Sequence, residues 1–241
     1  MAEIIDFHSH ILPAMDDGSR TGQESVAMLE MQQKQGIRRV LATPHFDARV
    51  DTPEVFLRRR AEAVARLDRA VSYCSGLPQV IPGAEVRYFP GMSHCEALEQ
   101  LTVAGTRTIL VEMPFTPWDQ AHYRELEGLS KRLGLVPVIA HVERYLGRFQ
   151  IGEVPQRLAE LPVLIQANAN FFLRFSTAPR AMAMLKKHQI HLLGSDCHDL
   201  VDRPPNLGKA VARIRSRLGE EALEHIAASQ NRALPILGSE T

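Results

Sequence analysis

The sequence predicts an α/β barrel, and two features of the chain lead to this prediction. Short runs of β-type apolar residues alternate with helical patterns along the 241 residues, which implies parallel strands joined by right-handed crossovers. Nearly every such run ends in a histidine or a carboxylate. An open, doubly wound sheet would gather its site at one switch point, whereas a barrel gathers side chains from every strand end at one mouth. The strand ends therefore favour the barrel.

The strands and helices can be assigned in chain order from apolar runs and helical spacing. Seven strands are expected, at residues 3–7, 38–43, 79–86, 106–113, 135–140, 162–167 and 190–195. Helices are expected at residues 22–35, 53–73, 92–103, 119–133, 178–188, 206–217 and 219–229. Pro53 suits a first helical position, and Gly36 and Gly134 each follow a helix end. Pro82 weakens the third strand, because proline has no amide hydrogen for a sheet.

Length and composition indicate one globular domain spanning residues 1–241, with no linker or repeat to mark a boundary. The 28 basic and 28 acidic residues give a formal net charge of zero, which argues against nonspecific binding to nucleic acid or to an anionic membrane. No apolar run reaches the roughly 20 residues of a membrane helix, and we expect no secretory signal and no disulfide framework. The expected location is cytoplasmic, without membrane insertion; the sequence does not indicate an oligomeric state.

The stretch DFHSHILPAMDDG at residues 6–18 holds the densest group of candidate ligands. His8 and His10 are two residues apart, so in extended backbone both imidazoles point to one face, as a metal clamp requires. Asp6 lies on the same face and is a candidate to orient one of these histidines. Taken alone, the pair fits a solvated polar strand end equally well. The candidates downstream shift the balance towards a metal site.

Glu85 and Glu112 are carboxylates that follow runs of buried-type residues. A carboxylate in such a place is costly unless it is paired or bound to a cation. For either residue alone, a salt bridge to Arg38, Arg87 or Arg107 is the ordinary alternative.

Further candidates follow later strands. His45 and His141 come after buried-type runs, although a lone histidine there is more often a loop or core residue than a ligand. Asp196 and His198 repeat the two-residue spacing of the first pair, so Cys197 between them should point away from the site. Imidazole and carboxylate together suit Mn, Fe or Zn, and using all the candidates requires two or three ions.

Two arginines lie near these candidates in the sequence. Arg144 is three residues past His141, and Arg203 is seven past Asp196. A guanidinium group beside a metal site would bind phosphate oxygens in a bidentate manner. Viewed singly, each arginine fits a surface salt bridge as well.

The order and content of these motifs resemble a known family. HSHILP and DDG near the N-terminus, followed by HVERY at 141–145 and SDCHDLVDRPP at 195–205, are similar to the polymerase-and-histidinol-phosphatase (PHP) superfamily. Within it they look most like the bacterial manganese-dependent protein-tyrosine phosphatases of capsule and exopolysaccharide operons. The likeness runs from residue 6 to about residue 205. It implies a distorted seven-stranded (β/α) barrel of PHP type, with the metal site at the C-terminal ends of the strands.

The resemblance also implies three divalent metals, Mn by the family pattern, with Fe or Zn as alternatives. One metal would be bound by His8, His10, Glu85 and Asp196, a second by Glu85, Glu112 and His141, and a third by Asp17, His45 and His198. Asp17 matches the motif better than Asp16, and Arg144 and Arg203 match the phosphate-contacting arginines. The implied substrate and partner is the phosphotyrosine tail of an exopolysaccharide-regulating tyrosine autokinase.

The reaction expected of such a site is phosphomonoester hydrolysis by a metal-bridging hydroxide. A cysteine mechanism competes, because five residues separate Cys197 from Arg203, but they include two aspartates and no glycine and make a poor anion cradle. A small-molecule phosphoesterase, such as a histidinol-phosphate phosphatase, would share the metal site and differ in pocket loops such as 46–53 and 113–123. A non-catalytic metal-binding scaffold is the third alternative.

Overall fold

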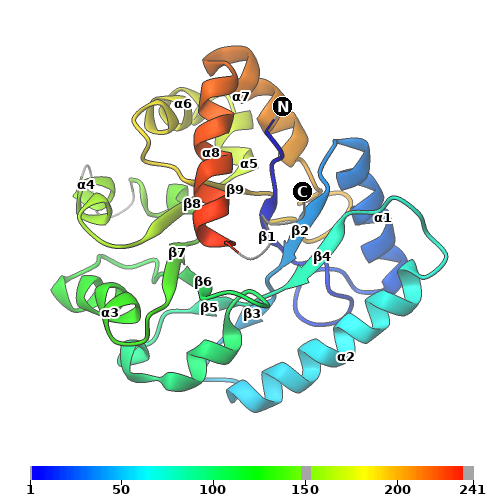
Figure 1. The fold of residues 1–241 in the computed structure, drawn as a ribbon, viewed down its shortest axis with the longest axis horizontal. Coiled ribbons are helices and arrows are strands. Elements are labelled where there is room, and N and C mark those ends of the chain that lie inside the picture. The colour runs from blue at the N-terminus through cyan, green and yellow to red at the C-terminus, as the bar shows by residue number, and fades with distance from the viewer. Residues whose placement is uncertain (1, 148–152, 236–241) are drawn as a thin grey trace.

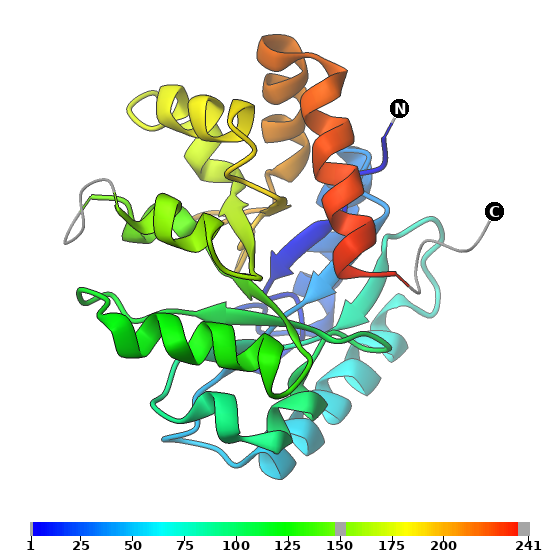
Figure 2. The ribbon, with the colours of Figure 1, turned by 60° about the vertical axis from the view of Figure 1, so that its left-hand side comes forward.

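The computed structural model describes residues 2–147 and 153–235, which form a curled parallel sheet surrounded by helices (Figures 1 and 2). One part of the sheet has the order β1-β2-β4, with strands Asp6–Ser9, Arg39–Ala42 and Gln79–Pro82. The other has the order β3-β5-β6-β7-β8-β9, with strands His45–Phe46, Glu85–Arg87, Thr108–Glu112, Val136–Ile139, Leu164–Asn168 and Leu192–Gly194. All the paired strands are parallel, as the alternation of strands and helices predicted.

One predicted strand is divided and an unexpected short strand follows another, so the described residues contain nine short strands where seven were predicted. The strand expected at 79–86 divides into β4 and β5, and β2 is followed after two residues by β3. A proline lies at each division, Pro44 in one and Pro82 in the other, and neither can donate to the sheet. The divisions place His45 and Glu85 at the beginning of short strands, opposite each other in register, rather than at the end of long ones.

The two ends of the sheet meet at β1 and β9. Ser9 and Cys197 form an isolated parallel bridge, the amide of His10 donates to the Cys197 carbonyl at 2.9 Å, and the amide of Asp196 donates to the His8 carbonyl at 2.8 Å. Helix α8 (Glu220–Ala233) lies along β1, where Gln230 accepts from the Ile5 amide at 2.8 Å (Figure 1). The last helix of the chain therefore holds its first strand in place.

Most of the helices lie close to their predicted positions. They are α1 (Gly22–Lys34), α2 (Pro53–Val71), α3 (Gln120–Lys131), α6 (Ala178–Lys186), α7 (Leu207–Leu218) and α8. Short helices α4 (Glu153–Ala159), α5 (Ala169–Leu173) and the 3₁₀ helix η3 (Val142–Tyr145) were not expected. No helix of the described residues is long and apolar enough to cross a membrane.

The helix predicted at 92–103 is wrong. The segment forms two 3₁₀ helices, η1 (Met92–His94) and η2 (Glu96–Leu101), separated by an extended Cys95. Leu98 and Leu101 are fully buried and three residues apart, which suits the three-residue turn of a 3₁₀ helix. The same spacing is also compatible with an α-helix, which is why the sequence pattern misled.

Candidate metal centre

The structure brings the nine candidate ligands together, with the carboxylate of Glu85 in the middle. Glu85 Oε2 lies 3.3 Å from His8 Nε2, 3.5 Å from His10 Nε2 and 2.8 Å from His45 Nδ1. Its other oxygen, Oε1, lies 2.9 Å from His141 Nε2. Salt bridges to the three arginines considered from the sequence do not account for this glutamate, because its neighbours are imidazoles.

The remaining candidates extend this cluster on three sides. Asp196 Oδ1 lies 3.6 Å from both His8 Nε2 and His10 Nε2, and Glu112 Oε1 lies 3.5 Å from His141 Nε2. Among the described residues, three overlapping sets have ligand atoms within 4.8 Å of one another, namely His10, Asp17, His45 and His198; His8, His10 and Glu85; and His45, Glu85 and Glu112.

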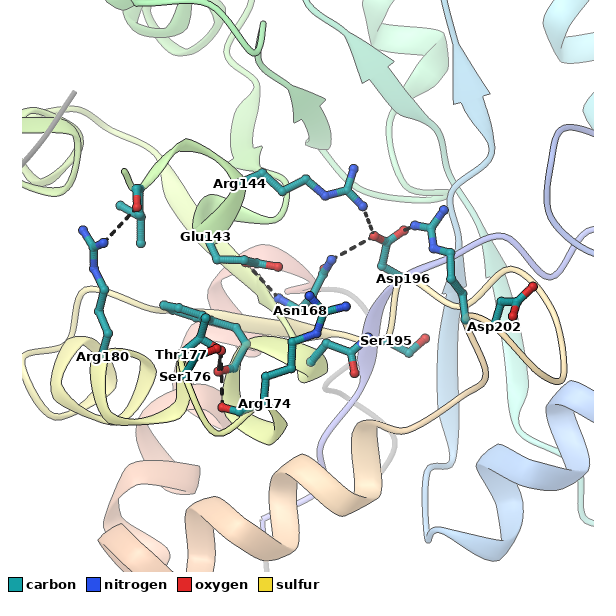
Figure 3. Close-up of a pocket in the computed structure, with 14 residues that line it drawn as sticks. Glu143, Arg144, Asn168, Arg174, Ser176, Thr177, Arg180, Ser195, Asp196 and Asp202 are labelled. Carbon is teal, nitrogen blue, oxygen red and sulfur yellow. Dashed lines mark hydrogen bonds and ion pairs between the residues drawn. The ribbon is translucent and has the colours of Figure 1, made fainter. Parts of the chain in front are cut away.

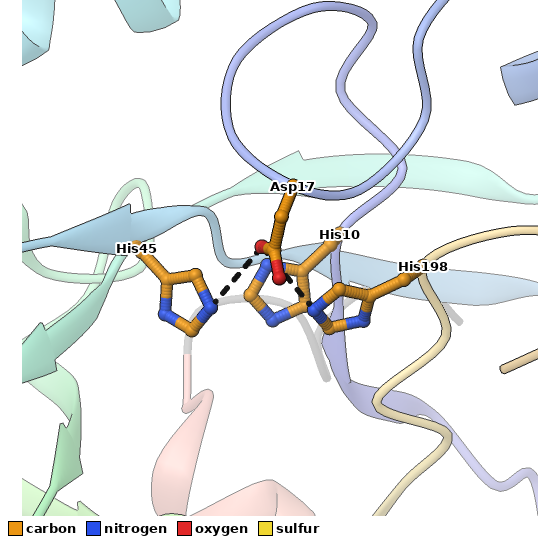
Figure 4. Close-up of side chains that lie close together, drawn as sticks. All are labelled: His10, Asp17, His45 and His198. Carbon is orange, nitrogen blue, oxygen red and sulfur yellow. Dashed lines mark ion pairs between the residues drawn. The ribbon is translucent and has the colours of Figure 1, made fainter.

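Figure 4 shows the set at the mouth of the centre, where Asp17 points between two imidazoles. Its Oδ1 atom lies 3.4 Å from His45 Nε2 and 3.5 Å from His198 Nε2. The ring of His10 lies beside that of His198, with the centroids 3.9 Å apart. These residues come from the loop after β1, from β3 and from the loop after β9, so the set exists only in the folded chain.

The hydrogen bonding of the cluster fits bound cations. Glu85 Oε2 and His198 Nε2 are buried and, within the described part of the chain, make no hydrogen bond of acceptable geometry. An unpaired buried polar atom is costly, and here three imidazole nitrogens lie within 3.5 Å of one carboxylate oxygen. Several divalent cations with imidazole and carboxylate ligands would satisfy these atoms.

The charges of the cluster also favour cations. Burial alone would raise the pKa of Glu85, but the neighbouring His8, His141 and His45 hold it well below its ordinary value. Burial opposes protonation of His8, yet the negative charges of Glu85 and Asp196 raise its pKa to about 9. The carboxylates thus stay ionised and attract positive charge into a buried space, in the form of protons or of metal ions.

Two of the candidate ligands have unusual backbone conformations. Among the described residues other than glycine, only Ala14, His141, His188 and Asp196 have positive φ angles. His141, at φ 33°, lies two residues past the end of β7, and Asp196, at φ 53°, lies two residues past the end of β9. Such conformations cost on the order of 1–3 kcal/mol and persist where the surrounding structure imposes them, often at functional sites.

Several residues that hold the cluster were not identified from the sequence. Asp16 accepts from His10 Nδ1 at 2.7 Å and from the His45 amide at 3.0 Å, so it orients one imidazole and fixes the start of β3. Gln166 lies 3.4 Å from His8 Nδ1, and Asn168 donates to Asp196 Oδ2 at 2.8 Å. The one signal in the sequence was the pair of polar residues, two apart, at the end of the 162–167 strand.

The role proposed for Asp6 from the sequence is not what the structure shows. Its Oδ1 atom accepts from the backbone amides of Ser195 at 2.7 Å and of His8 at 3.3 Å, and Oδ2 accepts from Gln32 at 2.5 Å. Asp6 therefore ties the loop after β9 to β1 and contacts no imidazole ring.

Both candidate arginines contact Asp196 at the edge of the cluster. Arg144 Nη2 lies 2.5 Å from Asp196 Oδ2, and Arg203 Nη2 lies 2.7 Å from Oδ1. Each guanidinium side chain is about a third exposed, at 35% and 37%, so part of each faces solvent beside the metal centre. Asp199 holds the second arginine's loop, because its Oδ1 accepts from three backbone amides, those of Val201, Asp202 and Arg203.

The cysteine expected to point away from the centre is fully buried. Cys197 packs in the apolar core, and burial raises the pKa of its thiol far above the ordinary value. A nucleophilic cysteine needs access and an ionised sulfur. The candidate pocket loops at 46–53 and 113–123 contain aromatic residues. Of these, Phe46 and Trp118 are also buried, whereas Phe115 is 43% exposed and lines a cavity with Arg144.

Comparison with known proteins identifies the family. The sequence model of the family described as "Capsular polysaccharide synthesis, CpsB/CapC" matches residues 4–234. The chain belongs to the CpsB/CapC family. This confirms the resemblance seen in the sequence motifs.

Two relatives show the degree of similarity. The tyrosine-protein phosphatase CpsB of Streptococcus pneumoniae is 30% identical over 244 residues, covering 92% of this chain and 94% of its own. The tyrosine-protein phosphatase YwqE of Bacillus subtilis is 30% identical over 226 residues, covering 90% and 86%.

A solved structure confirms the fold. It comes from work on YwqE and CpsB, which it describes as metal-dependent tyrosine phosphatases, and it superposes with a TM-score of 0.81. The match covers 95% of this chain and 94% of that one, at 24% sequence identity. The curled parallel sheet is therefore the fold of the family.

Proposed function

We propose that this chain is a metal-dependent protein-tyrosine phosphatase. The observation that carries the proposal is the buried cluster around Glu85, in which two polar atoms lack hydrogen bonds and the ligand types suit divalent cations. Membership of a family whose named relatives are tyrosine-protein phosphatases supplies the reaction. The cluster and the family point to the same chemistry independently.

Three divalent ions, Mn first and Fe or Zn as alternatives, would use the whole cluster. The ligands would be His8, His10, Glu85 and Asp196 for one ion, Glu85, Glu112 and His141 for a second, and Asp17, His45 and His198 for a third. The central position of Glu85, with imidazoles facing both of its oxygens, suits a carboxylate shared by two ions.

The residues of this chain would contribute orientation and charge to the reaction. Bound cations would supply a water of lowered pKa and neutralise phosphoryl charge. Arg144 and Arg203 would donate to the phosphate oxygens, since both guanidinium groups are already fixed beside the cluster by Asp196. Phe115, stacked 6.2 Å from His141 between ring centroids, presents an exposed aromatic face to the phenol ring of the substrate.

The finer features expected from the sequence belong to the same proposal. We expect the curled sheet to be a distorted seven-stranded (β/α) barrel of PHP type, with β2 and β3 counted as one interrupted strand and β4 and β5 as another. The barrel would form a single domain of residues 1–241, a span that includes residues outside the described ranges. The partner would be a tyrosine autokinase of the exopolysaccharide system, met in the cytoplasm, with the phosphotyrosine of its tail as substrate.

The test is to measure hydrolysis of a phosphotyrosine peptide and of histidinol phosphate side by side. Each assay is run with added Mn²⁺, with chelator and with Cys197→Ser. Peptide turnover that needs metal and survives the serine substitution is expected. A preference for histidinol phosphate would overturn the substrate assignment. Activity that is lost in Cys197→Ser but independent of metal would overturn the metal mechanism. No turnover of any phosphoester would favour the non-catalytic metal-binding scaffold.

A further inference from the structure

A cavity of about 490 Å³ opens directly beside the metal centre (Figure 3). It shares Arg144, Asp196 and Arg203 with the centre and extends away from them along the connection between α5 and α6. Its volume lies in the range of small-ligand pockets, roughly 300–1,000 Å³.

Two of the arginines that line the cavity form no ion pair with a carboxylate among the described residues. Arg174 and Arg180 line it in addition to the two arginines of the centre. In the part of the chain that the structure describes, the Arg174 guanidinium makes no hydrogen bond or ion pair, and Figure 3 shows it extending towards Asn168. Arg180 donates to the Leu146 carbonyl at 2.8 Å, a neutral acceptor. Two exposed guanidinium groups thus line one space, and neither forms an ion pair within the described part of the chain.

The acidic residues of the lining do not cancel this charge. Asp196 is already paired with two arginines and faces the proposed cations. Glu143 accepts from the Asn168 amide at 3.3 Å. Asp202 lies in the loop that carries Arg203, on the far side of Asp196 from Arg174 in Figure 3. The part of the cavity around Arg174 is therefore the part that an anion would enter.

We infer that this cavity is a subsite for a second anionic group of the peptide whose phosphotyrosine occupies the metal centre. The group is a phosphate ester or a carboxylate, since guanidinium forks bind both. This inference rests on the proposed phosphatase function and adds a rule of substrate choice to it. Exposed Phe175, adjacent to Arg174, and exposed Val201, in the Arg203 loop, offer apolar surface for the peptide on either side.

The geometry sets which peptides should benefit. The centre and the cavity share the Asp196 side chain, so the two anionic groups occupy neighbouring positions. In an extended peptide, side chains two residues apart point to the same face and are about 6–7 Å apart along the chain. A second anion two residues from the reactive phosphotyrosine is therefore expected to reach the cavity.

The experiment compares kcat/KM for a series of phosphotyrosine peptides with the metal-loaded, full-length protein. The residue at one to four positions on either side is phosphotyrosine, glutamate or glutamine. The wild type is expected to prefer the anionic peptides about fivefold, the size of an exposed charge-assisted contact. In Arg174→Gln this ratio is expected to fall towards one, whereas Arg217→Gln, which changes an exposed arginine of α7, keeps it.

The outcomes separate this inference from the proposed function. Equal rates for anionic and neutral peptides in the wild type, or a ratio that survives Arg174→Gln, would overturn the subsite while leaving the phosphatase intact. A response to phosphotyrosine but not to glutamate identifies the phosphate ester as the ligand, and an equal response identifies any anion. Absence of turnover for every peptide would instead refute the phosphatase proposal. In that case, direct binding of a non-hydrolysable doubly charged peptide would be measured to test the subsite on its own.

Discussion

Gly18 is the residue at which a single methyl group should disable the metal centre. A Cβ atom on Gly18 would lie 2.1 Å from the carbonyl oxygen of His10 and 2.5 Å from its Cβ. The next residue, Ser19, is hydrogen-bonded to the same place, because its backbone amide donates to the His10 carbonyl at 2.9 Å. The clash is therefore with backbone, which cannot rotate away as a side chain can.

The size of the effect follows from these distances. Contacts below 3.0 Å are essentially never seen for a real Cβ, so Gly18→Ala must separate the two backbones by about 0.9 Å. Overpacking of this kind costs about 3 kcal/mol, which a domain with about 5–15 kcal/mol of stability survives. A displacement of about 1 Å at a reacting centre costs about 100-fold in rate, and we expect that loss in kcat/KM.

The assay combines metal content, peptide hydrolysis and urea unfolding for Gly18→Ala and for a control. Gly105→Ala is the control because its φ of +75° makes alanine strained while nothing lies within 4 Å of the new Cβ. It should lose about 1 kcal/mol of stability and keep its metal and activity. If Gly18→Ala behaved like the control, the reasoning that the DDG turn sets the position of His10 would be refuted.

Three further predictions follow, two for residues around the centre and one for a residue remote from it. Asp16→Ala removes the acceptor of His10 Nδ1 and should weaken metal binding about 10-fold to 100-fold, measured by metal titration. Asp199→Ala removes the acceptor of three loop amides and should lower kcat/KM about tenfold at unchanged metal content, because Arg203 loses its fixed position. Burial, with the charges of nearby His225 and Arg232, lowers the pKa of His191 to about 4, below its ordinary 6.5. Its neutral form therefore stabilises the fold fully above pH 6.5, and this contribution, on the order of 2 kcal/mol, is lost as pH falls towards 4. His191→Asn, which retains an acceptor for the Ile165 amide, should show a smaller fall in unfolding free energy between pH 7.5 and 4.5; an equal fall would contradict the assignment.

The sequence was sufficient to predict that the candidate ligands meet. Parallel strands all end at one edge of a sheet, so charged residues placed after buried runs, such as His141 and Asp196, are brought together whatever the details of the barrel. The two-residue spacing of His8 and His10 carries their common direction as well. These inferences depend only on local pattern and chain direction, which the sequence contains.

Other parts of the site depend on tertiary structure that the sequence does not encode locally. Asp16 and Asp17 are adjacent, and only the path of the turn decides that one holds His10 and the other faces His45. Gln166 is uncharged and lies within β8, so apart from its two-residue spacing from Asn168 nothing in the sequence marked it as a partner of His8. The positive φ of His141 is imposed by its surroundings against its own preference.

The junction of β1 with β9 makes the metal centre a late product of synthesis. His8 and Asp196 come from opposite ends of the chain, and Gln230 in α8 secures the strand that carries the first of them. A growing chain that lacks β9 offers only an incomplete ligand set, and a chain that lacks α8 leaves β1 without its hydrogen bonds to that helix. Since binding of ions is itself folding free energy, metal loading should follow the synthesis of β9 and α8, and fragments that lack these elements should remain metal-poor and open to proteolysis.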